Sequence, residues 1–125
     1  MLADQHFHGL GEGGQQFDRV GATRRLWTSQ GNHGQGGADL PIPLLLGTSG
    51  IGLFFDNSSR GQLVAGDSIS GTGIEYMVED GPLDLYVITG DNPRQLLERA
   101  TDVLGRAPMP PRWALGFMQS TRHFD

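Results

Sequence analysis

The sequence predicts a mainly β protein, in which an antiparallel β-sandwich is followed by one helix and one further buried strand. First, the 125 residues include 20 glycines and seven prolines, a content that favours many turns. Second, short apolar segments are separated by a turn about every eight to twelve residues, the spacing typical of an antiparallel sandwich. Third, the apolar period changes after Asp91 from that of a strand to that of a helix.

The strands are expected in the following order. A short strand enters a long polar loop, a hairpin follows after two prolines, and three more strands separated by turns complete the sandwich. Their expected ranges are Leu26–Gln30, Pro41–Gly47, Ile51–Asn57, Gln62–Gly66, Ile74–Glu79 and Leu83–Thr89. In the last of these, the alternating residues Leu83, Leu85, Val87 and Thr89 share one face.

A helix is expected from Pro93 to Leu104. Asn92 is a typical N-cap, Pro93 suits the first helical position, and Gln95 completes a capping box. Gly105 ends the helix. Three prolines then keep residues 108–111 extended, and the apolar run Trp113–Met118 predicts a strand buried on both faces, with polar residues after it. Strands of an α/β barrel present a ligand site in this way.

Composition excludes several functional classes. The formal net charge of −5 gives no reason to expect nucleic acid or an anionic membrane as a partner. Without cysteine there are no disulfides or thiolate metal sites, and no cofactor is expected. No apolar run is long enough to span a membrane, and the first residues do not form a secretory signal. The compartment stays open, with the cytoplasm slightly favoured.

Three motifs near the N-terminus have a functional and a structural interpretation. Gly9-x-Gly11-x-x-Gly14 spells the dinucleotide-binding fingerprint, but no buried strand precedes it and no helical period follows, so a tight glycine loop is expected. His6 and His8 share one strand face, yet no third metal ligand lies at useful spacing, and a structural role is expected. Asp18 and Arg19 are expected to form an ion pair that fixes the glycine loop, with a substrate role as the alternative.

Taken in order, the chain resembles the N-terminal region of glycoside hydrolase family 31, the α-glucosidases and α-xylosidases. Eight segments carry the resemblance over nearly the full length, and the last is the most specific. They are Phe7–Glu12, Asp18–Gly21, Leu26–Trp27, Pro43–Gly47, Gly52–Asn57, Leu83–Gly90, the helix ending in Gly105–Pro108, and Pro110–Phe117. The resemblance implies a galactose-mutarotase-like β-sandwich over residues 1–90, a linking helix and proline-rich linker over 91–112, and the first strand of an incomplete (β/α)8 barrel over 113–125.

The resemblance also implies a retaining glycosidase that acts on α-linked oligosaccharides or glycosides. Members of the family use two aspartates about 5 Å apart, both on later barrel strands. Since 125 residues cannot hold a barrel of about 250, no catalytic residue is expected here, and the missing barrel of the same polypeptide is the expected partner. Substrate contacts are expected from Gln30 and Asn32 in the loop after Trp27, and from Gln119, Arg122 and His123 after the barrel strand.

Two other classes of function are open from the sequence. One is a carbohydrate-binding β-sandwich without catalysis. The other is a mutarotase-like isomerase, which needs a histidine and a glutamate facing one sugar; His6 or His8 with Glu75 is the available pair. The family commonly has an aromatic residue near Arg122, and an arginine there favours an anionic or differently substituted sugar.

Overall fold

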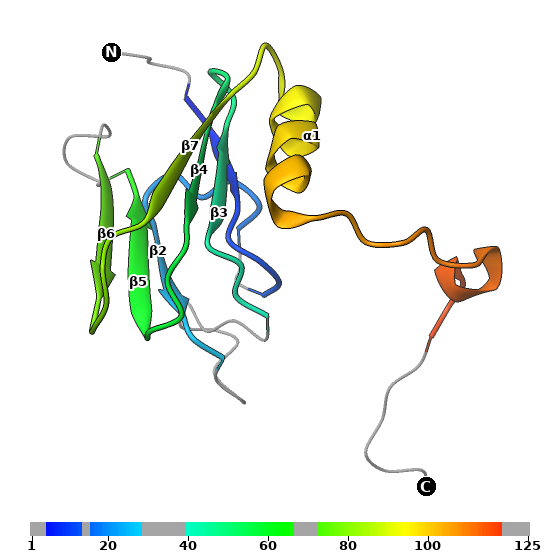
Figure 1. Ribbon diagram of the computed structural model, residues 1–125, viewed down its shortest axis with the longest axis horizontal. Coiled ribbons are helices and arrows are strands. Elements are labelled where there is room, and N and C mark those ends of the chain that lie inside the picture. The colour runs from blue at the N-terminus through cyan, green and yellow to red at the C-terminus, as the bar shows by residue number, and fades with distance from the viewer. Residues whose placement is uncertain (1–4, 14–15, 29–39, 67–72, 119–125) are drawn as a thin grey trace, which may run out of the picture.

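A computed structural model describes residues 5–13, 16–28, 40–66 and 73–118 of the chain. Its elements are β1 (Phe7–Gly9), β2 (Ala22–Leu26), β3 (Leu44–Gly47), β4 (Ile51–Phe55), β5 (Gly61–Ala65), β6 (Ile74–Val78), β7 (Leu85–Thr89), α1 (Pro93–Leu104) and the 3-10 helix η1 (Arg112–Leu115). The strands form a four-stranded sheet of order β1-β3-β4-β7 and a three-stranded sheet of order β2-β5-β6. Every pairing is antiparallel, and the two sheets face each other (Figure 1). The predicted β-sandwich is confirmed.

The hairpin of β3 and β4 forms where the sequence predicts it. Leu45 pairs with Leu53 across the hairpin, and the turn closes with a hydrogen bond from Gly50 N to Gly47 O. Gly50 has a φ of +87°, and a Cβ there would lie 2.2 Å from the carbonyl oxygen of Gly90. Only glycine fits such a turn. The other pairings of β4 join it to β7 over five residues, so β4 lies inside the four-stranded sheet.

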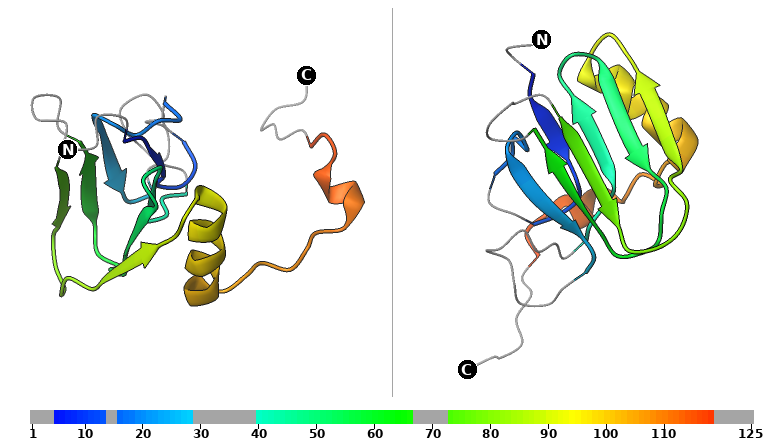
Figure 2. Two further views of the ribbon diagram at one scale, coloured as in Figure 1. Left: turned by 90° about the horizontal axis from the view of Figure 1, so that it is seen from above. Right: turned by 90° about the vertical axis from the view of Figure 1, so that its left-hand side faces the viewer.

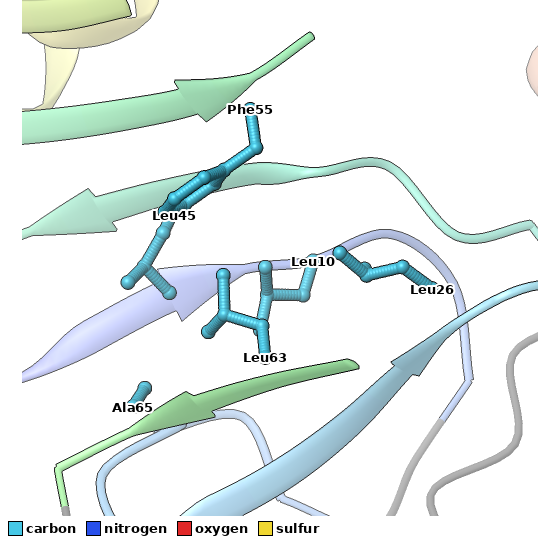
Figure 3. Close-up of a cluster of buried hydrophobic side chains, with 6 residues drawn as sticks. All are labelled: Leu10, Leu26, Leu45, Phe55, Leu63 and Ala65. Carbon is cyan, nitrogen blue, oxygen red and sulfur yellow. The ribbon is translucent and has the colours of Figure 1, made fainter. Parts of the chain in front are cut away.

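The main core lies between the two sheets and draws three side chains from each layer. It consists of Leu10, Leu26, Leu45, Phe55, Leu63 and Ala65 (Figure 3). Strand β2 supplies Leu26 to this core, but it spans Ala22–Leu26 and not the predicted Leu26–Gln30. The prediction was wrong because Arg24 points inward with Leu26, so that the strand does not show an apolar alternation.

Helix α1 covers the outer face of the four-stranded sheet. Leu96 and Ala100 are fully buried and pack with Ile88 of β7, against Leu44 and Phe54. The predicted N-cap is confirmed, since Gln95 N donates to Asn92 Oδ1 at 3.0 Å. The side chain of Gln95 reaches one residue further back than in a standard capping box and accepts from Asp91 N at 2.9 Å. The four-stranded sheet is therefore packed on both faces, while the three-stranded sheet turns its outer face away from the core (Figure 2).

The inner face of β7 extends past the core. Leu85 pairs with the buried Phe55, and Val87 pairs with Leu53, which places both on the face that looks toward the other sheet. Nevertheless, Val87 is 63% exposed and Leu85 is 39% exposed. The facing sheet has three strands against four, so an apolar strip of β7 is left uncovered by the described residues.

Beyond α1 the chain leaves the sandwich and forms η1 at some distance from it (Figure 1). The sequence predicts a strand over Trp113–Met118, whereas residues 112–115 are a 3-10 helix here. A strand needs a neighbour for its backbone groups, and none of the described strands pairs with this segment. Ala114 N and Gly116 N instead donate to the nearby Pro111 and Trp113 carbonyls. Trp113 is 81% exposed as a result.

Candidate functional site

The substrate-contact residues predicted from the sequence all lie outside the described residues. These are Gln30, Asn32, Gln119, Arg122 and His123. The structure does describe the residues on either side of the predicted loop after Trp27. We call Trp27 and Thr28 before the loop, together with Pro41 after it, the loop root. The candidate functional site is therefore built from the described residues around that root.

These residues line a hollow of about 420 Å³ at one end of the sandwich. Its wall combines Leu26, Trp27 and Thr28 at the end of β2, Pro41 and Pro43 before β3, the turn Asn57-Ser58-Ser59, and Tyr76 of β6. Aromatic faces and neighbouring hydroxyl groups are the chemical partners of a sugar ring, since the ring has an apolar face and a polar edge. The hollow is suited to hold such a ligand.

Trp27 is the main aromatic side chain of the hollow. Its side chain is partly open to solvent, at 42% exposure, and the guanidinium carbon of Arg60 lies 4.9 Å from its ring centroid. This cation–π contact orients the indole and is worth about 0.5–1 kcal/mol at an exposed site. The contact joins the end of β2 to the start of β5, and no pattern in the sequence predicts it.

Tyr76 closes the back of the hollow. Its ring stacks on the buried Phe55 with centroids 4.4 Å apart, which ties the hollow to the core. Burial raises the pKa of the Tyr76 hydroxyl above its ordinary value of 10.0. The hydroxyl is therefore neutral at physiological pH and is available as a hydrogen-bond donor.

Asn57 shapes the turn at the rim and is not itself free to bind a ligand. Its Nδ2 donates to the carbonyl oxygens of Asp80 and Pro82, at 3.2 and 3.0 Å, and its Oδ1 accepts from Ser59 N at 2.7 Å. These bonds occupy both amide hydrogens and one lone pair. They also bear on the triplet Asn57-Ser58-Ser59, which has the form of a glycosylation sequon, because a glycan on Nδ2 would displace one of the two donated bonds.

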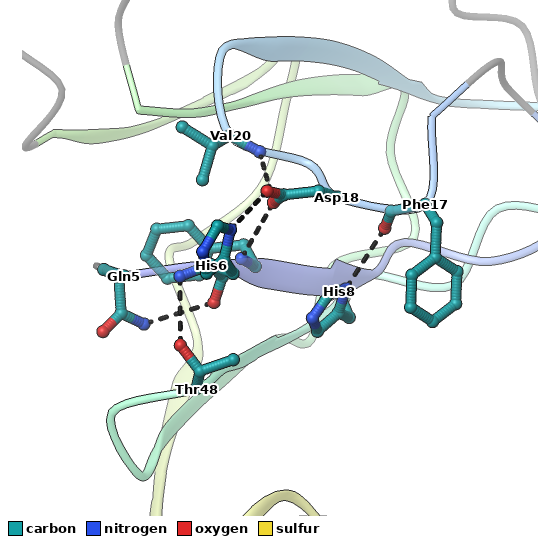
Figure 4. Close-up of polar contacts among 8 residues, drawn as sticks. Gln5, His6, His8, Phe17, Asp18, Val20 and Thr48 are labelled. Atoms are coloured by element: carbon teal, nitrogen blue, oxygen red, sulfur yellow. Dashed lines mark hydrogen bonds and ion pairs between the residues drawn. The ribbon is translucent and has the colours of Figure 1, made fainter.

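The two histidines of the N-terminal strand make structural contacts (Figure 4). His6 Nδ1 donates to Asp18 Oδ2 at 2.5 Å, and His8 Nδ1 donates to the carbonyl oxygen of Phe17 at 3.2 Å. Asp18 Oδ1 in turn accepts from the backbone N–H groups of Val20 and Phe7. The hydrogen bond from His6 is the main cause that lowers the pKa of the Asp18 carboxyl below its ordinary 3.8, and the two N–H groups add to it against the opposing effect of burial.

The glycine loop is fixed by two arginines that donate to its carbonyl oxygens. Arg19 Nε donates to Gly9 O at 3.0 Å and its Nη1 donates to Gln16 O at 2.6 Å, while Arg24 binds the carbonyls of Leu10 and Glu12. The predicted ion pair of Asp18 and Arg19 is therefore wrong: Arg19 fixes the loop through its carbonyl oxygens, whereas Asp18 bonds His6 and the N–H groups before and after the loop.

These contacts also decide how the fingerprint sequence is used. In a phosphate-binding loop the N–H groups converge on an anion. Here the carbonyl oxygens converge on cations, and the N–H groups of Leu10 and Glu12 are already bonded to Leu44 and Leu40. The described part of the loop therefore has the wrong polarity for a nucleotide phosphate.

The pair required by the isomerase interpretation does not meet. His6 and His8 belong to the β1 edge of one sheet, whereas Glu75 is an exposed residue of β6 in the other sheet. Across the ranges that the structure describes, no group of three or more His, Cys, Asp or Glu residues could hold a metal ion. No helix of this described part is long and apolar enough to cross a membrane.

The two antiparallel sheets define the class of the domain as a β-sandwich. The family model of the glycosyl hydrolase 31 N-terminal galactose mutarotase-like domain matches residues 1–63. The chain belongs to glycosyl hydrolase family 31, as part of its N-terminal domain. The family resemblance drawn from the sequence is confirmed.

Curated relatives agree with this assignment. The chain is 31% identical to alpha-xylosidase XylQ of Lactiplantibacillus pentosus over 121 residues, which cover 97% of this chain and 16% of the relative. It is 33% identical to alpha-glucosidase 2 of Bacillus thermoamyloliquefaciens over 129 residues, which cover 96% of this chain and 16% of the relative. The chain thus spans about a sixth of the length of these relatives.

Solved structures of the family share the fold. A dextranase of Flavobacterium johnsoniae, solved in complex with isomaltotriose, superposes with a TM-score of 0.78 at 29% identity, covering 92% of this chain and 14% of the dextranase chain. A family 31 alpha-glucosidase of Bacteroides thetaiotaomicron shares the fold with a TM-score of 0.74 at 24% identity, covering 93% of this chain and 20% of its own. These matches confirm the predicted mutarotase-like fold.

Proposed function

We propose that this chain is the N-terminal region of a retaining α-glycosidase, α-glucosidase-like in its chemistry, and that it is catalytically incomplete alone. The observation that carries the proposal is the match of nearly the whole chain to a sixth of an alpha-xylosidase and of an alpha-glucosidase. Residues 1–90 then form the sandwich, residues 91–112 link it, and residues 113–125 enter the catalytic barrel as its first strand. The two catalytic aspartates lie in the barrel of the same polypeptide.

In the complete enzyme the sandwich contributes substrate contacts and no reacting group. Gln30 and Asn32, which follow Trp27 in the sequence, bind hydroxyl groups of an α-linked oligosaccharide. Gln119, Arg122 and His123 follow the first barrel strand and contact the sugar at the barrel mouth. An arginine at position 122 favours a sugar that carries a negative or otherwise altered substituent. The hollow beside Trp27 supports the placement of sugar contacts at this end of the sandwich.

Hydrolysis assays test the proposal directly. The polypeptide expressed from the complete coding sequence should release nitrophenol from a 4-nitrophenyl α-glucoside or α-xyloside, and the first product seen by NMR should be the α-anomer. The purified 125-residue chain should give no turnover. Turnover by that chain, or a complete protein inert toward all α-glycosides, would contradict the proposal. Equal cleavage of neutral and acidic α-glycosides would contradict the role given to Arg122.

A second candidate function is a carbohydrate-binding sandwich without catalysis. The aromatic hollow at Trp27 favours it, because that hollow lies within the described chain and needs no barrel. Binding of maltotriose to the 125-residue chain, with loss of binding in Trp27→Ala, would support this function. An inert complete protein together with such binding would make it the better of the two.

A further inference from the structure

A second hollow, of about 400 Å³, lies on the outer face of the three-stranded sheet. Strand register explains its floor: Arg25 of β2 pairs with Gln62 of β5, and Gln62 pairs with Met77 of β6. These three side chains form a row across the sheet on the face opposite to the core, since Arg24 and Leu63, their neighbours in sequence, point inward. Arg60 and Glu79 complete the wall.

Within the described ranges, the two arginines of this hollow form no ion pair with a carboxylate. Elsewhere on the described chain the exposed arginines Arg94 and Arg106 form ion pairs one helical turn away, with Glu98 and Asp102. Arg25 and Arg60 form no ion pair among the described residues, and the contact of Arg60 is with the ring of Trp27. Two guanidinium groups therefore line one hollow with their hydrogen-bond donors unspent by any acid of this part of the protein.

The composition of the hollow indicates the class of ligand. Guanidinium groups bind carboxylate and other oxyanions through two parallel hydrogen bonds, and the Gln62 amide offers a further donor. Met77 offers apolar surface in the wall, and the ring of Trp27 beside Arg60 offers more for a sugar face. Glu79 adds one negative charge to a wall that carries two positive charges. The remaining positive charge matches a singly charged ligand better than a doubly charged phosphate.

We propose that Arg25 and Arg60, with Gln62, form a binding site for an acidic saccharide on the outer face of the three-stranded sheet. The carboxylate of a uronic acid residue is held by the two guanidinium groups. The adjoining residues of the oligosaccharide pass Trp27, whose ring lines the hollow at the loop root and lies against Arg60 of this hollow. The site lies on the sandwich itself and does not depend on the catalytic assignment proposed above.

Binding to the 125-residue chain tests this site without any catalysis. A Trp113→Phe background leaves Trp27 as the fluorescent reporter, because the chain has two tryptophans. An oligosaccharide with one glucuronic acid residue should change the Trp27 emission, and its affinity should fall as salt is raised. A matched oligosaccharide with glucose in that place should bind at least about tenfold more weakly, the effect of one charge-assisted contact.

Variants separate this site from a general effect of charge. Arg25→Gln and Arg60→Gln should each weaken binding of the acidic oligosaccharide by about tenfold or more. Arg112→Gln removes an arginine outside the sandwich and should leave the affinity unchanged. Equal binding of the neutral and acidic oligosaccharides, no binding of either, or an equal effect of Arg112→Gln would overturn the proposal. Inorganic sulfate or phosphate that binds as tightly as the acidic oligosaccharide would show a general anion site and would overturn it too.

Discussion

Replacement of Arg24 by methionine should destabilise the protein, although the residue is charged and lies in an apolar core. Arg24 is 2% exposed, and it donates Nε to Leu10 O at 3.4 Å and an Nη2 hydrogen to Glu12 O. Methionine keeps much of the volume but donates nothing. The carbonyl of Leu10, a residue with no exposed surface, then loses a charged donor.

The magnitude follows from these two bonds. A bond from a charged donor contributes about 1.5–3 kcal/mol, and a buried acceptor left alone costs about 1–3 kcal/mol. The bond to Leu10 is long and Glu12 can turn to water, so we expect Arg24→Met to lower the free energy of unfolding by about 2–3 kcal/mol. A domain of this size has about 6–19 kcal/mol in total. The loss is therefore well above the error of a urea titration.

Arg25→Met is the matched control. It makes the same change one residue along β2, on the opposite face, where the side chain is exposed. We expect it to alter the free energy of unfolding by no more than about 0.5 kcal/mol. Urea unfolding followed by circular dichroism gives both values. If the two variants were equally stable, or Arg24→Met were the more stable, the reasoning about the buried guanidinium would be refuted.

Three further comparisons between variants test other contacts by the same urea titration. Leu96→Ala should lower the free energy of unfolding by about 2–5 kcal/mol, because Leu96 of α1 is buried. Leu97→Ala should lower it by less than about 1 kcal/mol, because Leu97 is half exposed. Similar losses in the two variants would show that α1 does not pack as described. Gly11→Ala should lower the free energy of unfolding more than Gly21→Ala does. Both glycines have positive φ, but a Cβ at residue 11 would lie 2.0 Å from Leu40 O, whereas a Cβ at residue 21 would meet nothing within 4 Å. An equal loss in the two variants would contradict the close approach at residue 11. Asp18 has a lowered pKa in the folded state, so its contribution to stability is present above the ordinary value of 3.8 and is lost as the pH falls through the folded pKa. The stability gap between wild type and Asp18→Asn should therefore narrow as the pH falls below 3.8, and a gap independent of pH would rule out the role given to this carboxylate.

Features set by neighbours in sequence were predictable. The cap at Asn92, the helix that follows and the hairpin turn at Gly50 depend on residues within a few positions of each other, and each forms where the sequence indicates. The sequence pattern predicts strand β2 too far along the chain, because Arg24 faces the core but is not an apolar residue. The reason for burying Arg24 lies in the carbonyls of residues more than ten positions away.

The contacts of the candidate sites depend on distant segments. Trp27 meets Arg60 only because β2 pairs with β5, and the row of Arg25, Gln62 and Met77 needs three strands in register. No pattern along the chain shows these arrangements. The same dependence explains Trp113–Met118, where an extended segment needs strands that the described part of the chain does not supply, and the backbone turns to local bonds instead.

The packing of α1 has a mechanical consequence for whatever follows it. Leu96 and Ala100 fix the helix on the four-stranded sheet, and Arg99 also donates to the carbonyl of Thr89. The chain therefore leaves the sandwich from a point that is fixed on the four-stranded sheet. Prolines in the next few residues stiffen that departure, because each locks its own φ and holds the residue before it extended. The sandwich thus sets the position of the segment that follows α1. A small rotation of the helix on its sheet would move the far end of that segment by a much larger distance.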